Sequence, residues 1–112
     1  MVDNGDRIAT SLRKGVVEFC VLALLDGGRS YGVDIARRLT AAGLIAGEGT
    51  LYPLLSRLRA AGHVTTEWIE SEAGRPRRYY ELTASGRAQL AEFRSAWAAL
   101  RASVEGFLEE ET

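Results

Sequence analysis

The side chains best suited to chemistry in this sequence are arginines, and three of them fall within four residues. Arg75, Arg77 and Arg78 form this cluster, whereas the glutamates at 109–111 lie just before the last residue, so these charges of opposite sign are segregated. The formal net charge is only -1, which argues against a uniformly basic surface for nucleic acid. Any binding to nucleic-acid phosphates must therefore come from a local cluster of this kind.

Catalytic and metal chemistry find little support. His63 is the only histidine and Cys20 the only cysteine, so no disulfide can form within the chain. Cys20 lies in the apolar run 16–25 and is expected to behave as a small buried hydrophobe. Metal-ligand spacing, a glycine-rich phosphate loop and a glycine-flanked nucleophilic serine do not occur. We therefore expect neither an enzyme nor a metal nor a cofactor.

Length and composition indicate one folded domain. The chain has 112 residues, which is enough for a modest core but too few for separate DNA-binding and sensing domains. Apolar residues make up 46% of it, more than a disordered chain would carry. The first seven residues are polar and acidic, unlike a signal peptide. The apolar run 16–25 is too short to span a bilayer. We expect a cytoplasmic protein without membrane contact.

The elements that would position the arginines can be predicted from apolar periodicity. Apolar residues recur at helical spacing over 8–25, which predicts a first helix with two buried faces, ended by Gly27 and Gly28. Ser30 is expected to cap a second helix over 31–42.

A third helix is predicted over 49–61 and would carry an inward stripe of leucines. Pro53 removes a backbone hydrogen bond, so an irregular or late first turn is expected there. The leucines of the stripe are Leu51, Leu54, Leu55 and Leu58.

The second half of the chain predicts a hairpin and a long helix. The apolar period changes to two in 63–70 and in 77–83, which indicates two strands of a wing over 63–83, with Trp68 and Tyr80 packed within it. Thr83 is expected to cap a last helix over 84–108. This order predicts a mainly α fold with a small β-hairpin, a winged helix-turn-helix in a single domain over 1–112.

Several motifs, in this order, resemble those of PadR-type transcriptional regulators. Leu24-Leu25 is similar to the end of the family's first helix, and Ser30-Tyr31-Gly32 with Asp34-Ile35 to the start of its second. The third-helix motif is Gly49-Thr50-Leu51-Tyr52-Pro53-Leu54-Leu55, followed by Arg57-Leu58, Gly62 and Trp68. The wing motif is Gly74-Arg75-Pro76-Arg77-Arg78-Tyr79-Tyr80-Glu81-Leu82-Thr83, followed by Gly86. Because they cover nearly the whole chain, a chance match is improbable.

The resemblance implies a dimeric DNA-binding regulator, with repressors as the known members of the compact subgroup. The short last helix is similar to that of members that lack an extra C-terminal domain and dimerise through this helix. Some respond to phenolic acids and others to flat aromatic drugs. In the latter a tryptophan on the last helix stacks on the ligand, and Trp97 falls in a similar place, although an aromatic residue in such a stripe can also be plain core.

The third helix is the candidate recognition helix, since a helix fits the major groove and its N-terminal residues reach base edges. The wing arginines would straddle phosphates or enter the minor groove, although they could serve solubility alone. Ser30 and Tyr31 could hold a phosphate at the second helix, with structural capping as the alternative for Ser30. The candidate DNA-binding residues are Ser30, Tyr31, Thr50, Tyr52, Pro53, Ser56, Arg57, Arg75, Arg77 and Arg78.

Apolar residues of the last helix repeat at spacings of three and four, as in a helix-to-helix seam. With the outer face of the first helix they would form a homodimer interface that presents two recognition helices to an inverted-repeat operator. The predicted interface residues are Ile8, Leu12, Val16, Phe19, Leu90, Phe93, Trp97, Leu100, Val104 and Phe107.

The leading hypothesis is thus a dimeric regulator, a repressor that a small aromatic effector releases from double-stranded DNA. The alternative is a winged-helix module that binds another protein, because the fold alone does not imply DNA contact. The arginine cluster favours DNA, whereas a large exposed apolar patch outside the dimer seam would favour a protein partner.

Overall fold

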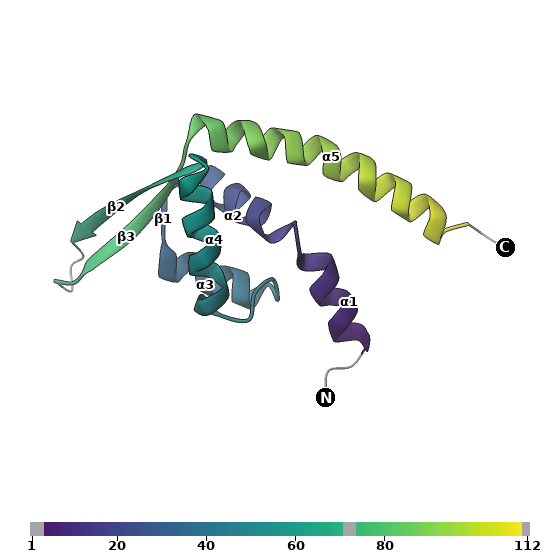
Figure 1. Cartoon of the computed structure of the whole chain (residues 1–112), viewed down its shortest axis with the longest axis horizontal. Helices are drawn as coiled ribbons and strands as arrows, with labels where there is room; N and C mark the ends of the chain where they lie inside the picture. Colours follow the sequence, from purple (N-terminus) through teal and green to yellow (C-terminus); the bar gives the residue numbers. More distant parts are fainter. Residues whose placement is uncertain (1–3, 71–73, 111–112) are drawn as a thin grey trace.

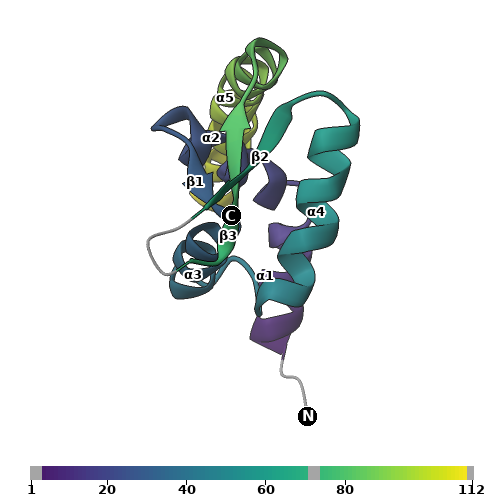
Figure 2. The same cartoon turned by 90° about the vertical axis from the view of Figure 1, so that its left-hand side faces the viewer.

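The structure is a computed structural model, and it describes residues 4–70 and 74–110 (Figure 1). A body of three helices carries a β-hairpin on one side, and a long helix crosses this body and extends away from the hairpin. In Figure 2 the hairpin has α3 on one side and α4 on the other. The elements in chain order are α1 (Asn4–Arg13), α2 (Val17–Asp26), β1 (Ser30–Tyr31), α3 (Gly32–Ala41), α4 (Glu48–Ala60), β2 (Val64–Glu70), β3 (Pro76–Leu82) and α5 (Ala84–Leu108).

The core lies where α2, α3 and α4 meet the base of the hairpin. Leu22, Ile35, Leu51 and Leu55 are among its fully buried side chains, and burial of each such side chain stabilises the fold by about 1.5–3 kcal/mol. All four leucines of the predicted α4 stripe are buried, so the inward face of this helix is confirmed. The opposite face of α4 is left exposed to solvent.

The prediction of one continuous helix over 8–25 is wrong, because the chain breaks between α1 and α2. Gly15 adopts a φ of +84°, in the left-handed region that favours glycine and ends helices. The backbone N–H of Val16 bonds back to the carbonyl of Arg13 at 3.1 Å, closing the turn. As a result α1 diverges from the body (Figure 1), and its apolar residues Ile8 and Leu12 are exposed.

The second helix also starts differently from the prediction. Ser30 does not cap it: Ser30 and Tyr31 form the short strand β1, and Tyr31 precedes α3 without a side-chain capping bond. β1 pairs antiparallel with β3, Ser30 opposite Tyr80 and Tyr31 opposite Tyr79, which gives a sheet of order β1-β3-β2. The wing is therefore anchored to the start of α3.

The expected late or irregular start of the third helix is wrong as well. α4 begins at Glu48 and contains Pro53. Pro53 lacks the N–H that would bond to the carbonyl of Gly49, four residues earlier. Both residues are exposed, so water can satisfy that carbonyl, and the helix continues through the proline.

The hairpin and the last helix agree with the prediction. β2 and β3 pair in register from Val64 opposite Leu82 to Glu70 opposite Pro76. The Thr83 hydroxyl accepts a hydrogen bond from the Gly86 N–H at 3.0 Å, which confirms the predicted cap, and α5 ends at Leu108 as expected. None of the helices in the described part of the chain is both long and apolar enough to cross a membrane.

Candidate nucleic-acid interface

The exposed face of α4 carries all five third-helix residues predicted to contact DNA. Thr50, Tyr52, Pro53, Ser56 and Arg57 are each exposed, as their spacing relative to the buried leucines requires. They divide between the two flanks and the crest of the helix. Thr50 and Arg57 border a cavity beside α2, whereas Tyr52 borders a groove beside the wing.

The crest of α4, between these flanks, consists of small side chains. Gly49, Pro53, Ser56 and Ala60 follow one another at spacings of four, three and four, and all are exposed. Small side chains let the helix axis lie close to a base edge, so the longer side chains on the flanks can reach the groove walls. Arg59 also lies exposed near the end of this helix. A basic residue in the last turn of this helix can be recognised from the sequence, but Arg59 was not among the predicted DNA-binding residues.

One face of the wing carries a column of stacked cationic and aromatic side chains. The rings of Tyr31 and Tyr79 stack with centroids 3.8 Å apart. The Arg29 guanidinium lies 4.6 Å from the Tyr79 centroid, and that of Arg77 lies 5.1 Å from the Tyr31 centroid. Such cation–π contacts contribute about 0.5–1 kcal/mol each at exposed sites. The column therefore holds two positive charges in a fixed direction at the edge of the sheet.

Arg29 is a basic residue of the wing that sequence reasoning missed. It precedes β1, and nothing local in the sequence places it beside Tyr79. The pairing of β1 with β3 brings the two together.

The other face of the wing holds Arg78 between two rings. Its guanidinium lies 5.3 Å from the Trp68 centroid and 6.0 Å from the Tyr80 centroid. Tyr80 is buried, as its predicted packing within the wing requires, and it joins the core of the domain. Trp68 is 63% exposed, so the expectation that it packs within the wing is wrong. Trp68 lies towards the tip of the hairpin, opposite Arg78, and the Arg78 guanidinium packs over its ring.

A groove between the wing and the starts of α3 and α4 brings the predicted residues together. Its volume is about 530 Å³. The predicted DNA-binding residues that line it come from β1, α4 and the wing, while Ser30 lies outside it. They are Tyr31, Tyr52, Arg75, Arg77 and Arg78.

Gly32 and two tyrosines set the shape of this groove. A Cβ at Gly32 would lie 3.2 Å from a ring carbon of Tyr52 and 3.3 Å from one of Tyr80, so the absence of a side chain lets Tyr52 lean against α3. Burial, followed by the nearby Glu48 charge, raises the pKa of Tyr52. A hydrogen bond with Tyr79 is the main cause that raises the pKa of Tyr31. Both phenols therefore stay protonated. The Tyr52 hydroxyl can donate to a phosphate oxygen, whereas the Tyr31 hydroxyl already donates to Tyr79.

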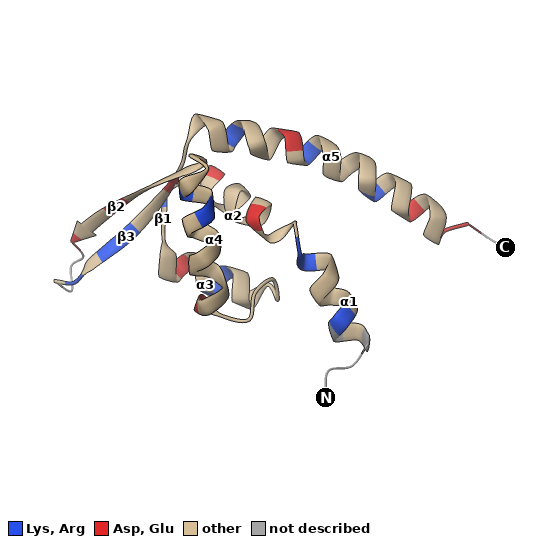
Figure 3. Ribbon diagram, viewed as in Figure 1, with Lys and Arg blue, Asp and Glu red and all other residues tan. Residues whose placement is uncertain are grey.

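Basic and acidic residues are distributed over the whole fold, with a cluster of arginines on β3. Figure 3 marks basic residues on β3 and α4, but also on α1 and along α5, where they alternate with acidic ones. The wing also contains Glu67, Glu70 and Glu81, so within the wing the positive charge gathers in the groove and the stacked column. A local concentration of this kind gives a chain of nearly zero net charge a positively charged surface.

The predicted dimer-interface residues divide into three groups. Leu90 is only 3% exposed and belongs to the core of its own chain, so its assignment to an interface is wrong. Val16, Phe19 and Phe93 are half-buried. The remaining predicted residues are exposed: Ile8, Leu12, Trp97, Leu100, Val104 and Phe107. Leu108 is exposed as well, although it was not among the predicted interface residues.

An aromatic cavity lies where α2 meets α5. Phe19 stacks on Phe93 with ring centroids 4.3 Å apart, and Phe93 stacks on Trp97 at 5.9 Å. The cavity beside them measures about 340 Å³ and also includes Cys20 in its wall. Burial raises the pKa of the Cys20 thiol, which leaves it as an apolar part of the lining.

Comparison with known proteins agrees with this fold and identifies its family. A family model described as the transcriptional regulator PadR-like family matches residues 21–92. The chain is 40% identical to the transcriptional regulator Rv3488 of Mycobacterium tuberculosis over 76 residues, which cover 68% of this chain and 70% of that protein.

Solved structures of two bacterial proteins are similar over almost the whole chain. A PadR-like transcriptional regulator of Bacillus cereus, BC4206, has a TM-score of 0.83 and 31% identity, with 90% of this chain and 99% of that one covered. A PadR family regulator of Eggerthella lenta has a TM-score of 0.83 and 31% identity, with coverage of 94% and 92%. The chain therefore belongs to the PadR-like family of DNA-binding transcriptional regulators.

Proposed function

We propose that this regulator is a homodimeric repressor that binds an inverted-repeat operator in double-stranded DNA and is released by a small aromatic effector. The observation that carries the proposal is the groove in which Tyr31, Tyr52, Arg77 and Arg78 converge beside the exposed face of α4. With α4 in the major groove, this arrangement would bring the arginines and the Tyr52 hydroxyl close to the flanking phosphates.

Dimerisation is supported by the apolar surface at the end of the molecule opposite the wing. α1 and the C-terminal half of α5 both project from the body on that side (Figure 1), and both carry exposed apolar side chains. The radius of gyration is 16.4 Å, against about 13 Å for a compact chain of this length. A second copy packed about a two-fold axis would cover both surfaces. The operator would then contain half-sites about one helical turn, roughly 34 Å, apart.

Effector release is supported by the aromatic cavity and by the connection from α5 to α4. A flat ligand can extend the stack of Phe19, Phe93 and Trp97, because Trp97 is partly exposed at its end. The first turn of α5 is bonded to the residues that follow α4, through the Thr83 hydroxyl and the carbonyl of Gly62 at 2.7 Å. A ligand that shifts α5 would thus change the spacing of the two recognition helices. Repression needs only occupancy of a promoter, since a bound dimer excludes the polymerase.

The experiment is a footprinting titration on the DNA that flanks the coding sequence of this protein. We expect one protected region that contains an inverted repeat, bound at least about a thousandfold tighter than random DNA. Planar aromatic compounds should then lower the affinity, and transcription from the protected promoter should rise. Protection without any preference over random DNA would contradict the operator, while a fall in transcription on protein removal would contradict repression.

A further inference from the structure

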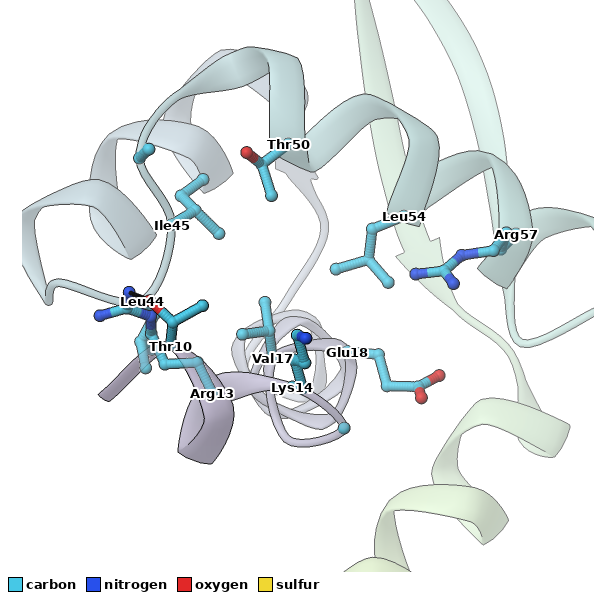
Figure 4. A pocket seen from close by; sticks show the side chains of 12 residues that line it. Thr10, Arg13, Lys14, Val17, Glu18, Leu44, Ile45, Thr50, Leu54 and Arg57 are labelled. Atoms are coloured by element: carbon cyan, nitrogen blue, oxygen red, sulfur yellow. Dashed lines mark hydrogen bonds between the residues drawn. The ribbon is translucent and has the colours of Figure 1, made fainter. Parts of the chain in front are cut away.

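A second cavity lies on the other side of α4, between that helix, the junction of α1 with α2, and the turn that precedes α4 (Figure 4). Its volume is about 560 Å³, which is in the range of small-molecule sites. Val17 and Leu54 point into it from opposite sides, and Leu44 and Ile45 complete an apolar floor. It shares no residue with the aromatic cavity at Trp97 or with the wing groove.

The rim of this cavity is charged and mostly positive. Arg13, Lys14 and Arg57 line it together with one carboxylate, Glu18, so its formal charge is +2 from three cations and one anion. The Arg13 guanidinium is already held, since it donates to the carbonyl of Gly43 at 3.2 Å and to the Thr10 hydroxyl at 3.1 Å. The bond to Gly43 holds α1 against the turn that precedes α4.

The other charged groups of the rim are not committed to protein partners. Within residues 4–70 and 74–110, the side chains of Lys14, Glu18 and Arg57 make no hydrogen bond or ion pair. Figure 4 shows the Arg57 and Glu18 side chains at the same end of the cavity. Two cations are thus available beside an apolar floor, and the single carboxylate can offset only one of them.

We infer that this cavity binds a small organic anion, an apolar ring or branched chain that carries one carboxylate. The apolar floor would take the body of the ligand, and Lys14 and Arg57 would take its charge. A neutral apolar ligand would leave one of these two cations without a counter-charge. Inorganic phosphate would leave the floor in contact with water. An apolar floor beside a positive rim therefore favours amphipathic anions over neutral apolar ligands and over inorganic phosphate.

If the proposed function holds, occupancy of this site should weaken DNA binding. Thr50 and Arg57 line the cavity and also lie on the exposed face of α4 that would contact DNA. A bound carboxylate would hold the Arg57 guanidinium away from the major groove. The ligand and the operator would then compete for one side chain, with no need for a change in the dimer.

The test compares 2-naphthoate with 2-naphthamide, which share a ring system and differ in charge. Titration of the full chain without DNA, followed by amide NMR shifts, measures affinity and location independently of any regulatory activity. We expect naphthoate to bind about threefold to fivefold tighter, the effect of one solvent-exposed charge pair. The largest shifts should fall on Val17, Ile45 and Leu54. Equal affinities, or shifts confined to Phe93 and Trp97, would overturn the inference.

Three variants in the cavity and one control on α5 sharpen the result. Lys14→Gln should abolish most of the preference for naphthoate, whereas Glu18→Gln should increase it, by a similar factor of about three. Ala46→Trp should fill the exposed side of the cavity and weaken both probes. Arg101→Gln, a change of the same charge on α5, should have no effect. A preference that survives both Lys14→Gln and Ala46→Trp would show that the anion binds elsewhere.

Discussion

The backbone carbonyl of His63 lies so close to Gly86 that a Cβ at position 86 would overlap it. The same carbonyl accepts a hydrogen bond from the Thr83 N–H at 3.1 Å, and the Thr83 side chain bridges Gly62 and Gly86. His63 follows the end of α4, and Gly86 lies in the first turn of α5. The end of α4 and the start of α5 therefore meet in a tightly packed joint, which leaves no room for one helix to slide against the other.

Replacement of Gly86 by Ala should loosen this joint. The added methyl group meets a backbone carbonyl, which cannot rotate away as a side chain could, so we expect a loss of about 1–3 kcal/mol in the free energy of unfolding. Gly106→Ala is the control, since it lies on the same helix with no atom within 4 Å of its Cβ. It should gain up to about 1 kcal/mol from helix propensity. Urea denaturation measures both, and equal effects would refute the tight joint.

Replacement of Arg75 and Arg77 together by Ala should weaken binding to all DNA sequences alike. Arginines that bind phosphates release counterions without reading bases, so the slope of log affinity against log salt should fall by about 0.9 for each phosphate that is no longer neutralised. The double variant Arg87→Ala/Arg101→Ala removes the same charge from α5, away from the wing groove, and should leave the slope nearly unchanged. An unaltered slope in the wing variant would exclude these arginines from the interface.

Arg57→Ala should act on sequence preference. We expect a cost of about 1–3 kcal/mol that is confined to one base-pair position of the operator, with non-specific binding nearly intact. Arg59→Ala, also on α4, serves as the comparison and should affect operator and random DNA equally if it binds a phosphate. Competition titrations with single-base operator variants measure the difference. Equal losses on operator and random DNA would reassign Arg57 to the phosphate-contacting class.

The proposed dimer seam can be tested with charge on α5. Val104→Asp together with Phe107→Asp would bury two carboxylates in the seam, so light scattering should detect monomers that bind a full operator no better than a half-site. Ala99→Asp with Ala102→Asp adds the same charge at exposed positions on the opposite side of the helix, and should remain dimeric. A seam variant that stays dimeric would show that α5 does not form the interface.

The aromatic effector site predicts a fluorescence response from Trp97. In a Trp68→Phe background Trp97 is the only tryptophan, and a planar ligand that stacks on it should quench its emission. The same titration in a Trp97→Phe background, where only Trp68 emits, should show little quenching because Trp68 lies on the wing. Quenching of Trp68 alone would place the ligand on the DNA-binding side.

Local signals in the sequence were sufficient to predict the elements whose defining residues lie close together in the chain. α5 has a Thr cap at one end and a continuous apolar stripe, and its predicted bounds are confirmed. The hairpin was predicted from a change of period to two, and the outward face of α4 from the spacing of its leucines. These features depend on residues within a few positions of one another, so a single sequence contains them.

Tertiary contacts decided the rest. β1 has only two residues and exists because Tyr31 meets Tyr79, which also places Arg29 in the wing. Leu90 belongs to the same apolar stripe as Val104, yet α2 packs on the start of α5 and leaves its end uncovered, so one is buried and the other exposed. Pairing across a sheet and coverage by a distant helix depend on residues far apart in the chain. Local periodicity cannot encode which part of a stripe finds a partner.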